Sequence, residues 1–145
     1  MENMHAQLRR FNLLISEMNA AYHEAALRLG LSDSAMMILY TVCMEGDSCP
    51  LSEITRLSGL SKQTIHSALR GLEAQGMAST RTLDGRRKQV CLKEQGRELA
   101  RRTVWRLIGV ENAIFESWSA QEQEQYLSLT KRYLEAFREG VRALP

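Results

Sequence analysis

The sequence predicts an all-α protein with one small β-hairpin, and three observations lead to this class. Apolar side chains recur at helical spacing from residue 8 to residue 144. That spacing is interrupted between residues 79 and 92, where two short β-compatible runs flank an Asp-Gly pair. Serines stand where helix N-caps are expected, at positions 32, 61 and 119. The length of 145 residues suits a single domain over residues 1–145.

The first predicted helix ends near Gly30 and carries a heptad repeat of apolar residues. The repeat advances alternately by three and four residues. Such a seam packs either on the protein's own core or on a partner, and its length favours some contact with a partner. Its members are Leu8, Phe11, Ile15, Met18, Tyr22, Ala25 and Leu29.

The next segments predict the order helix, break, helix, turn, helix. A helix over residues 32–43 is followed by a break at 46–50, which contains a glycine and a proline. A short helix over 52–57 then leads to a turn at 58–60. The central glycine of that turn can take the positive φ of a tight corner. The third helix of the group is expected over 61–75.

A hairpin and two long helices complete the predicted order. The hairpin strands are expected at 79–83 and 88–92. One continuous helix should then follow Lys93 and reach about Trp118. A capping box at 119–122 opens the last helix.

The helix over 61–75 has an apolar stripe and an opposite face suited to nucleic acid. Ile65, Leu69 and Leu72 step by four and three residues, so they share one buried face. The other face offers amide, hydroxyl, imidazole and cationic groups, which hydrogen-bond base edges and phosphates. The first acidic residue after the cap is Glu73, so this face has no carboxylate that phosphate would repel. The candidate DNA-contacting residues here are Lys62, Gln63, Thr64, His66, Ser67 and Arg70.

The charge distribution supports the same interpretation. The net charge is +2, but residues 61–93 carry seven basic and two acidic residues, a local charge of +5 that leaves −3 elsewhere. Arg86, Arg87 and Lys88 at the hairpin tip are further candidates, because arginine suits a narrow minor groove. Asp84 is expected to hold an arginine in place across the turn. The alternative is a hairpin with solvated charges, and the preceding helix-turn-helix favours DNA contact.

These segments resemble the MarR family of bacterial winged helix-turn-helix transcriptional regulators. The similarity covers the whole order of elements, and it extends to motifs from about Leu51 to Leu99. The segments that carry it are Leu-Ser-Glu-Ile at 51–54, Gly-Leu-Ser-Lys-Gln-Thr-Ile at 59–65, Leu-Glu-Ala-Gln-Gly-Met at 72–77, Asp-Gly-Arg-Arg at 84–87 and Leu-Lys-Glu-Gln-Gly at 92–96.

The resemblance implies a homodimer and a sequence-specific DNA-binding regulator. Residues 1–30 and 94–145 would form the dimerisation helices, and 32–92 the winged helix-turn-helix. Two recognition helices would enter successive major grooves of a pseudo-palindromic operator in double-stranded DNA. In that arrangement Gln63, Thr64 and Ser67 read bases and Arg86 enters the minor groove. The sequence departs from the family in its short wing and in Lys93, which replaces a hydroxyl residue before the fifth helix.

The resemblance also implies a repressor that a small aromatic effector, or an oxidant, releases. A pocket for such an effector could lie between the first two helices, where adaptable and aromatic side chains gather. Core packing explains the same residues without a ligand. They are Phe11, Met18, Tyr22, Met36, Met37 and Tyr40.

Two other classes of regulator remain as alternatives. A thiol-based redox sensor would use an accessible thiolate, and Cys49, in a predicted loop, is the best candidate although Asp47 would raise its pKa. Cys43 is expected to be buried and Cys91 to lie in the wing strand. A winged helix that binds proteins instead of DNA would carry an acidic or apolar recognition face, and residues 62–70 show neither.

Several function classes lack support in the sequence. Paired carboxylates, nucleophile elbows, phosphate-binding glycine loops and His-Glu-x-x-His motifs are absent, so we expect no enzyme and no cofactor. His5, His23 and His66 are widely separated, so no metal site is predicted. No run approaches the roughly 18 apolar residues of a membrane span, and residues 1–10 are polar, so a cytoplasmic protein is expected.

Overall fold

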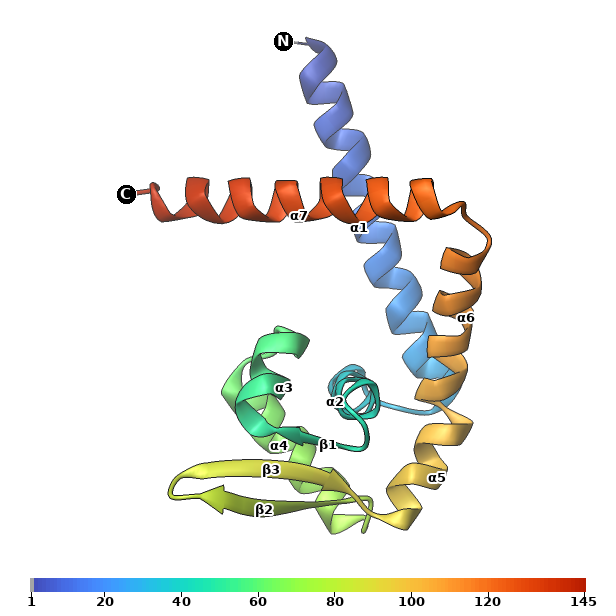
Figure 1. Cartoon of the computed structure of the whole chain (residues 1–145), viewed down its shortest axis with the longest axis vertical. Helices are drawn as coiled ribbons and strands as arrows, with labels where there is room; N and C mark the ends of the chain where they lie inside the picture. The colour runs from blue at the N-terminus through green and yellow to red at the C-terminus, as the bar shows by residue number, and fades with distance from the viewer. Residues whose placement is uncertain (1) are drawn as a thin grey trace. The chain divides into compact units, whose positions relative to one another are not determined.

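The computed structural model describes residues 2–145, and in that part of the chain it contains seven helices and one three-stranded antiparallel sheet (Figure 1). The chain forms two compact units, the first extending to Ile108 and the second beginning at Gly109. The elements are α1 (Glu2–Leu29), α2 (Asp33–Met44), β1 (Ser48–Pro50), α3 (Leu51–Ser58), α4 (Lys62–Ala74), β2 (Ala78–Asp84), β3 (Arg87–Leu92), α5 (Glu94–Arg102), α6 (Val104–Glu116) and α7 (Ala120–Arg142). The predicted all-α class with a small hairpin is confirmed.

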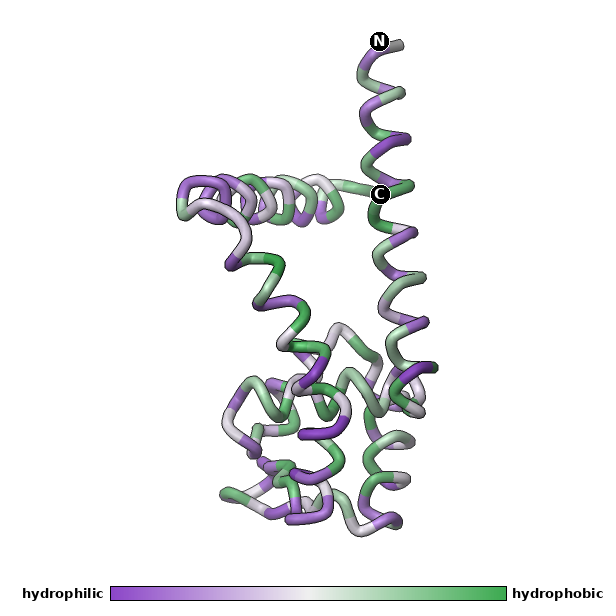
Figure 2. Tube along the Cα trace, turned by 90° about the vertical axis from the view of Figure 1, so that its right-hand side faces the viewer, coloured by the Kyte–Doolittle hydropathy of each residue, from purple (hydrophilic) through white to green (hydrophobic). Residues whose placement is uncertain are grey.

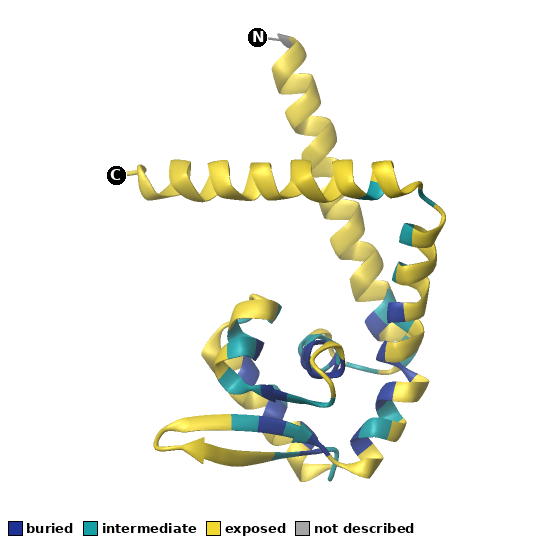
Figure 3. Cartoon of the chain, viewed as in Figure 1, coloured by how far each residue is buried: buried dark blue, intermediate teal, exposed yellow. Residues whose placement is uncertain are grey.

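The hydrophobic core lies in the first unit, around α2 (Figure 3). Leu39 and Val42 of α2 are fully buried together with Ile65 of α4 and Val90 of β3. Val104, at the start of α6, completes this set. Burial of such side chains is the main force that holds α4 and the sheet to the body of the unit.

The sheet has the strand order β1-β3-β2, with β3 paired antiparallel to both neighbours. Cys49 of β1 and Thr80 of β2 lie on either side of Val90. The expectation of an unstructured break at 46–50 was wrong, because residues 48–50 form β1. A three-residue strand that ends in proline has no periodicity of its own, and its pairing with β3 is a tertiary contact.

Local capping explains where three helices begin, as predicted. The Ser32 hydroxyl accepts a hydrogen bond from the Ala35 amide at 3.1 Å. Ser61 caps α4 in the same way, and Ser119 forms a reciprocal capping box with Glu122 at the start of α7. Each of these bonds satisfies an amide that the helix itself leaves unpaired.

The turn between α3 and α4 depends on glycine. Gly59 has a φ of +70°, a left-handed conformation in which a side chain is strained. It ends α3 and turns the chain toward α4. The corner predicted for this position is confirmed.

The single long helix predicted after Lys93 was wrong, because Thr103 divides it into α5 and α6. Thr103 has φ −124° and ψ −92°, outside the helical region. Its buried hydroxyl donates to the Leu99 carbonyl at 2.6 Å. Such a bond to the carbonyl four residues earlier is a known cause of helix bending.

The second unit consists of the rest of α6, a short turn and α7. Phe115, Trp118 and Tyr126 pack edge-to-face, with ring centroids 5.2 to 6.1 Å apart. The Gln123 amide also donates to the Phe115 carbonyl at 2.6 Å. These contacts fix the corner between α6 and α7.

Long stretches of α1 and α7 expose apolar side chains. Residues 3–24 of α1 are exposed, and α7 has no buried residue in the described chain (Figure 3). Apolar and polar residues are interspersed along α1, as the hydropathy colouring shows (Figure 2). The exposed residues include Leu8, Phe11, Ile15, Met18 and Tyr22 of the α1 seam and Tyr126, Leu127, Tyr133, Leu134, Phe137 and Val141 of α7.

Within residues 2–145, no one helix has both the length and the apolar character to cross a membrane, and α1 with α2 meets that test only when the two are taken as a bent pair.

Candidate nucleic-acid interface

Helix α4 presents the two faces that its sequence predicts. Ile65, Leu69 and Leu72 are buried in the core. Seven polar side chains of α4 are exposed, and we call the six that precede Glu73 the outward face. They are Lys62, Gln63, Thr64, His66, Ser67 and Arg70.

Thr64 takes part in the cap at the start of α4. The Ser61 hydroxyl accepts from the Thr64 amide at 3.2 Å and donates to the Thr64 hydroxyl at 2.8 Å. The Thr64 hydroxyl therefore accepts one bond locally and keeps its own proton to donate elsewhere. This cap fixes the orientation of Thr64 on its helix.

The hairpin β2–β3, which we call the wing, ends in a clamped tip. Asp84 accepts two hydrogen bonds from the Arg87 guanidinium, at 2.9 and 3.0 Å. This bond raises the pKa of Arg87. The sequence alone left open which arginine Asp84 would hold, and the structure pairs it with Arg87. Among the described residues Arg86 has no ion-pair partner, so its charge stays available at the tip.

A cavity of about 570 Å³ lies between α3, the first turns of α4 and the wing. Leu51, Ile65 and Leu83 give it an apolar surface, and cationic side chains line it together with the carboxylate of Glu53, which is paired with Arg56. Of the sequence-predicted residues, it brings together Lys62, His66, Arg86, Arg87 and Lys88, whereas Gln63, Thr64, Ser67 and Arg70 are not part of its lining. Sequence analysis missed Leu51 and Leu83, because their roles depend on the packing of α3 against the hairpin.

Two polar contacts connect the wing to the body of the unit. The Thr80 hydroxyl of β2 donates to the Glu73 carboxylate of α4. The Gln89 amide of β3 donates to the Ser48 hydroxyl of β1 at 3.2 Å. A second cavity, of about 190 Å³, separates α4 from the wing. Neither contact was predicted, because the partners are brought together only by the fold.

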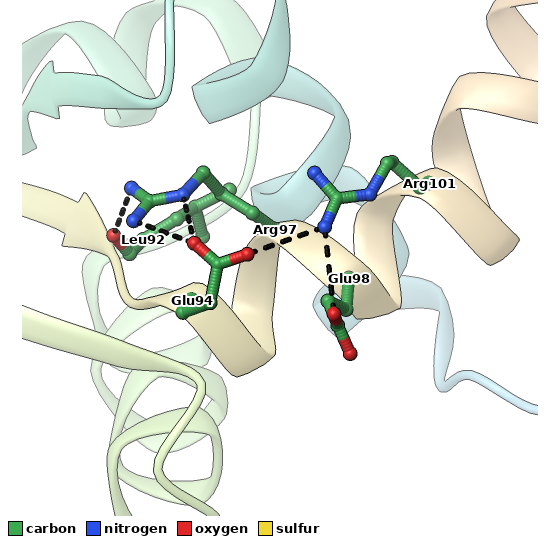
Figure 4. A network of polar contacts seen from close by, with 5 residues as sticks. All are labelled: Leu92, Glu94, Arg97, Glu98 and Arg101. Carbon is green, nitrogen blue, oxygen red and sulfur yellow. Dashed lines mark hydrogen bonds and ion pairs between the residues drawn. The ribbon is translucent and has the colours of Figure 1, made fainter.

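The start of α5 is held against the end of β3 by a charged network (Figure 4). Arg97 donates to the Leu92 carbonyl at 3.2 Å and to Glu94 at 3.1 and 3.2 Å. Arg101 contacts Glu94 at 3.3 Å and Glu98 at 3.7 Å. The bonds from Arg97 and then Arg101 lower the pKa of Glu94.

Lys93 and Gly96 complete this junction. The Lys93 side chain makes no capping bond to α5, consistent with the missing hydroxyl noted in the sequence. Its amide instead donates to the Met77 carbonyl at 2.9 Å. Gly96 is buried so closely that an added Cβ would lie 2.0 Å from the same carbonyl oxygen. The start of α5 therefore packs directly on the turn that follows α4.

The residues suggested for an effector pocket fall into two groups. Met36 is buried in the core, and Met37 and Tyr40 of α2 are partly buried. Phe11, Met18 and Tyr22 of α1 are 38 to 44% exposed. Core packing accounts for Met36 and Tyr40, whereas the α1 residues lie on the exposed seam.

Two of the three cysteines lie where the sequence predicted them, Cys43 buried in α2 and Cys91 in the wing strand, and Cys49 does not. All three are free thiols, but Cys49 lies buried in β1, so its placement in an accessible loop was wrong. Burial, followed by Glu45 and Glu53, raises the pKa of Cys49 to about 11. Burial and Asp47 raise the pKa of Cys43 to about 12, so Asp47 acts on Cys43. Cys91 lies partly exposed in β3, the wing strand expected for it.

No group of three or more His, Cys, Asp or Glu side chains within residues 2–145 could hold a metal ion.

The helix-turn-helix followed by a basic hairpin defines a winged helix-turn-helix protein. Comparison with family models then matches residues 29–88 to the MarR family. The central part of the chain, which holds the helix-turn-helix and most of the wing, is therefore similar to the MarR family. A search of curated proteins found no match.

Solved structures agree with this fold over most of the chain. A MarR-family regulator from Neisseria meningitidis aligns with a TM-score of 0.83 at 18% identity, covering 94% of this chain and 96% of its own. A MarR-family regulator from Streptomyces coelicolor, solved in complex with DNA, aligns with a TM-score of 0.75 at 16% identity. The alignment covers 94% of this chain and 88% of that protein. BpsR from Bordetella bronchiseptica aligns with a TM-score of 0.63 at 16% identity, covering 85% of this chain and 97% of its own. The DNA binding of BpsR is regulated by 6-hydroxynicotinic acid.

Proposed function

We propose that this protein is a MarR-family regulator that binds operator DNA in a sequence-specific manner. The observation that carries the proposal is the outward face of α4, which is exposed and has no carboxylate from Lys62 to Leu72. The wing adds Arg86, whose charge is not neutralised by Asp84. Cationic and hydrogen-bonding groups without opposing carboxylates suit phosphates and base edges.

The roles of individual residues follow from their placement. Gln63, Thr64 and Ser67 offer the amide and hydroxyl groups that read base edges in a major groove. We assign Lys62, His66 and Arg70 to contacts with bases or backbone, and Arg86 to the minor groove. Arg87 and Lys88 then contribute to the positive electrostatic potential at the wing tip. The charge of Arg87 is partly neutralised by its pairing with Asp84.

The functional form is proposed to be a homodimer. Apolar side chains on α1 and α7 are exposed in a single chain, and their burial against a second copy would remove them from water. A two-fold dimer presents two α4 helices, so its operator would be pseudo-palindromic with half-sites about one helical turn apart.

We infer that the protein is a cytoplasmic repressor and that a small aromatic molecule releases it from DNA. Support comes from BpsR, whose DNA binding is regulated by a small aromatic acid. The exposed Phe11, Met18 and Tyr22 of α1 are the candidates for contact with such a molecule. A thiol switch is less well supported, because Cys43 and Cys49 are buried and their pKa values are raised.

The experiment that tests this function is a mobility-shift assay with the DNA upstream of the protein's own gene. An unrelated duplex serves as control, and both are measured at several salt concentrations. We expect selective binding to the upstream DNA that weakens steeply as salt rises. If neither duplex binds at low salt, DNA recognition by the isolated protein is excluded.

A further inference from the structure

The two strands of the wing are held differently, because β3 is anchored in the core by Val90 and Leu92 whereas β2 is buried only at its first residue. Ala78 is the buried residue of β2, and residues 80–84 are exposed. A cavity of about 190 Å³ lies between α4 and the wing instead of packed side chains. Apolar packing therefore does not fix β2 against α4 beyond Ala78, whereas β3 is held by its own buried residues and by its pairing with β1.

One polar contact bridges α4 and the wing beside that cavity. The Thr80 hydroxyl donates to the Glu73 carboxylate, and both side chains line the cavity. Glu73 is the one acidic residue in the sequence of α4, and it stands close to the end of the helix. A carboxylate near DNA weakens binding by repulsion, so its presence here calls for a compensating role.

We propose that the Glu73–Thr80 hydrogen bond is a latch that positions the wing for DNA contact. It joins the end of α4 to β2, and the clamp of Arg87 by Asp84 then holds the tip that carries Arg86. Glu73 and Thr80 are thus positioning residues that act through Arg86. The inference rests on the proposed function, since it concerns how the wing reaches DNA.

The test uses variants that remove or keep the latch. Thr80→Val removes the hydroxyl without changing the shape of the side chain, and Glu73→Ala removes the acceptor. Thr80→Ser keeps a donor and Glu73→Gln keeps an acceptor, so these are the matched controls. We expect Thr80→Val and Glu73→Ala to bind operator about three- to tenfold more weakly, the range for one net hydrogen bond. The controls should stay within about twofold of the wild type.

A double-mutant cycle with Arg86→Ala separates positioning from general destabilisation. If the latch positions Arg86, the loss of operator affinity caused by Arg86→Ala should be smaller when Thr80→Val is already present. We expect this loss to shrink at least about threefold. Thermal unfolding checks that every variant folds. Amide hydrogen exchange of β2 without DNA should be faster in Thr80→Val and unchanged in Thr80→Ser.

The possible outcomes are distinguishable. If the losses of operator affinity caused by Thr80→Val and Arg86→Ala simply multiply in the double variant, the positioning role is overturned. Wild-type operator affinity in both Thr80→Val and Glu73→Ala would overturn it as well. Unchanged β2 exchange in Thr80→Val would also overturn the latch. Failure of the wild-type protein to bind DNA would instead overturn the proposed function, and the DNA role of the latch with it.

Discussion

Arg86 and Arg87 are sequence neighbours with different surroundings. Arg87 donates two hydrogen bonds to Asp84, so the pair has little net charge and its geometry is fixed. Arg86 follows Gly85 at the exposed tip and has no such partner among the described residues. The Asp84 carboxylate thus orders the wing tip without neutralising Arg86, the side chain that we propose to enter a groove.

This difference predicts unequal effects on the salt dependence of binding. Arg86→Ala should weaken binding to any duplex and reduce the slope of log affinity against log salt by about 0.9, the value for one phosphate contact. Arg87→Ala should change the slope less, because Asp84 already neutralises that charge. Fluorescence anisotropy titrations at several salt concentrations measure both slopes. Equal slopes in the wild type and Arg86→Ala would remove Arg86 from the interface.

The cysteines predict a specific order of thiol reactivity. Because burial raises the pKa of Cys49 to about 11, roughly one in a thousand of its thiols is ionised at pH 8. Cys43, with a pKa of about 12, is still less ionised, whereas Cys91 is partly exposed. Alkylation followed by peptide mapping should therefore modify Cys91 first, and Cys43 and Cys49 only on unfolding. Rapid modification of Cys49 in the folded protein would restore the redox alternative.

The same shifts fix the sign of a pH effect on stability. A thiol with a raised pKa stabilises the folded state fully below its unfolded pKa of about 8.5. That contribution is lost as the pH rises toward about 11 for Cys49 and about 12 for Cys43. The two thiols therefore favour the folded state at neutral pH and lose this effect only in alkaline solution.

At the scale of elements, α5 is bound closely to the turn after α4. Gly96 lies against the Met77 carbonyl, and Arg97 holds the Leu92 carbonyl at the end of β3. The turn that follows α4, the end of β3 and the start of α5 therefore share one junction. A displacement of α5 would be transmitted to both elements that we propose to contact DNA, because packed contacts resist gradual deformation.

Gly96→Ala should disrupt this junction. The new Cβ would lie 2.0 Å from the Met77 carbonyl oxygen, so the backbone must shift, and we expect a loss of about 2–3 kcal/mol in the free energy of unfolding. Gly71→Ala in α4 is the matched control, because an added Cβ there meets nothing within 4 Å. It should stabilise by about 0.5–1 kcal/mol. Chemical denaturation at one protein concentration measures both, and equal stabilities would contradict the close packing at Gly96.

The sequence predicted elements that local chemistry determines and missed those that tertiary contacts create. The serine caps and the turn at Gly59 follow from hydrogen bonding and φ at single positions, and they were found. Strand β1 exists only because β3 lies beside it. The break at Thr103 depends on a hydroxyl bond to Leu99 that helical periodicity does not reveal.

The candidate site shows the same division. The outward face of α4 could be predicted because helical spacing alone separates it from the buried stripe. The pairing of Asp84 with Arg87 was not determined by spacing, since Arg86 and Arg87 both follow Asp84 within three residues. The latch between Glu73 and Thr80 joins two elements across a turn, and no local pattern in the sequence predicts it.

At the scale of the whole molecule, the exposed faces of α1 and α7 are the main feature that a single chain leaves unexplained. The α1 seam keeps its heptad spacing while Leu8, Ile15 and Met18 remain 39 to 50% exposed. Exposed apolar surface of this length is typical of association. Each unit separately offers such a surface, α1 in the first and α7 in the second.

A charge placed on either surface should therefore prevent dimerisation. Ile15→Glu on α1 and Leu134→Glu on α7 each put a carboxylate where the proposed dimer buries apolar side chains, and burial of an unpaired charge is strongly unfavourable. Both variants should be monomeric in sedimentation equilibrium, and their operator affinity should fall by more than about tenfold because one α4 helix is lost from each complex. Met44→Glu, at an exposed methionine at the end of α2, is the matched control and should remain dimeric. A wild-type monomer, or dimers of unchanged affinity in both variants, would show that α1 and α7 do not form the dimer.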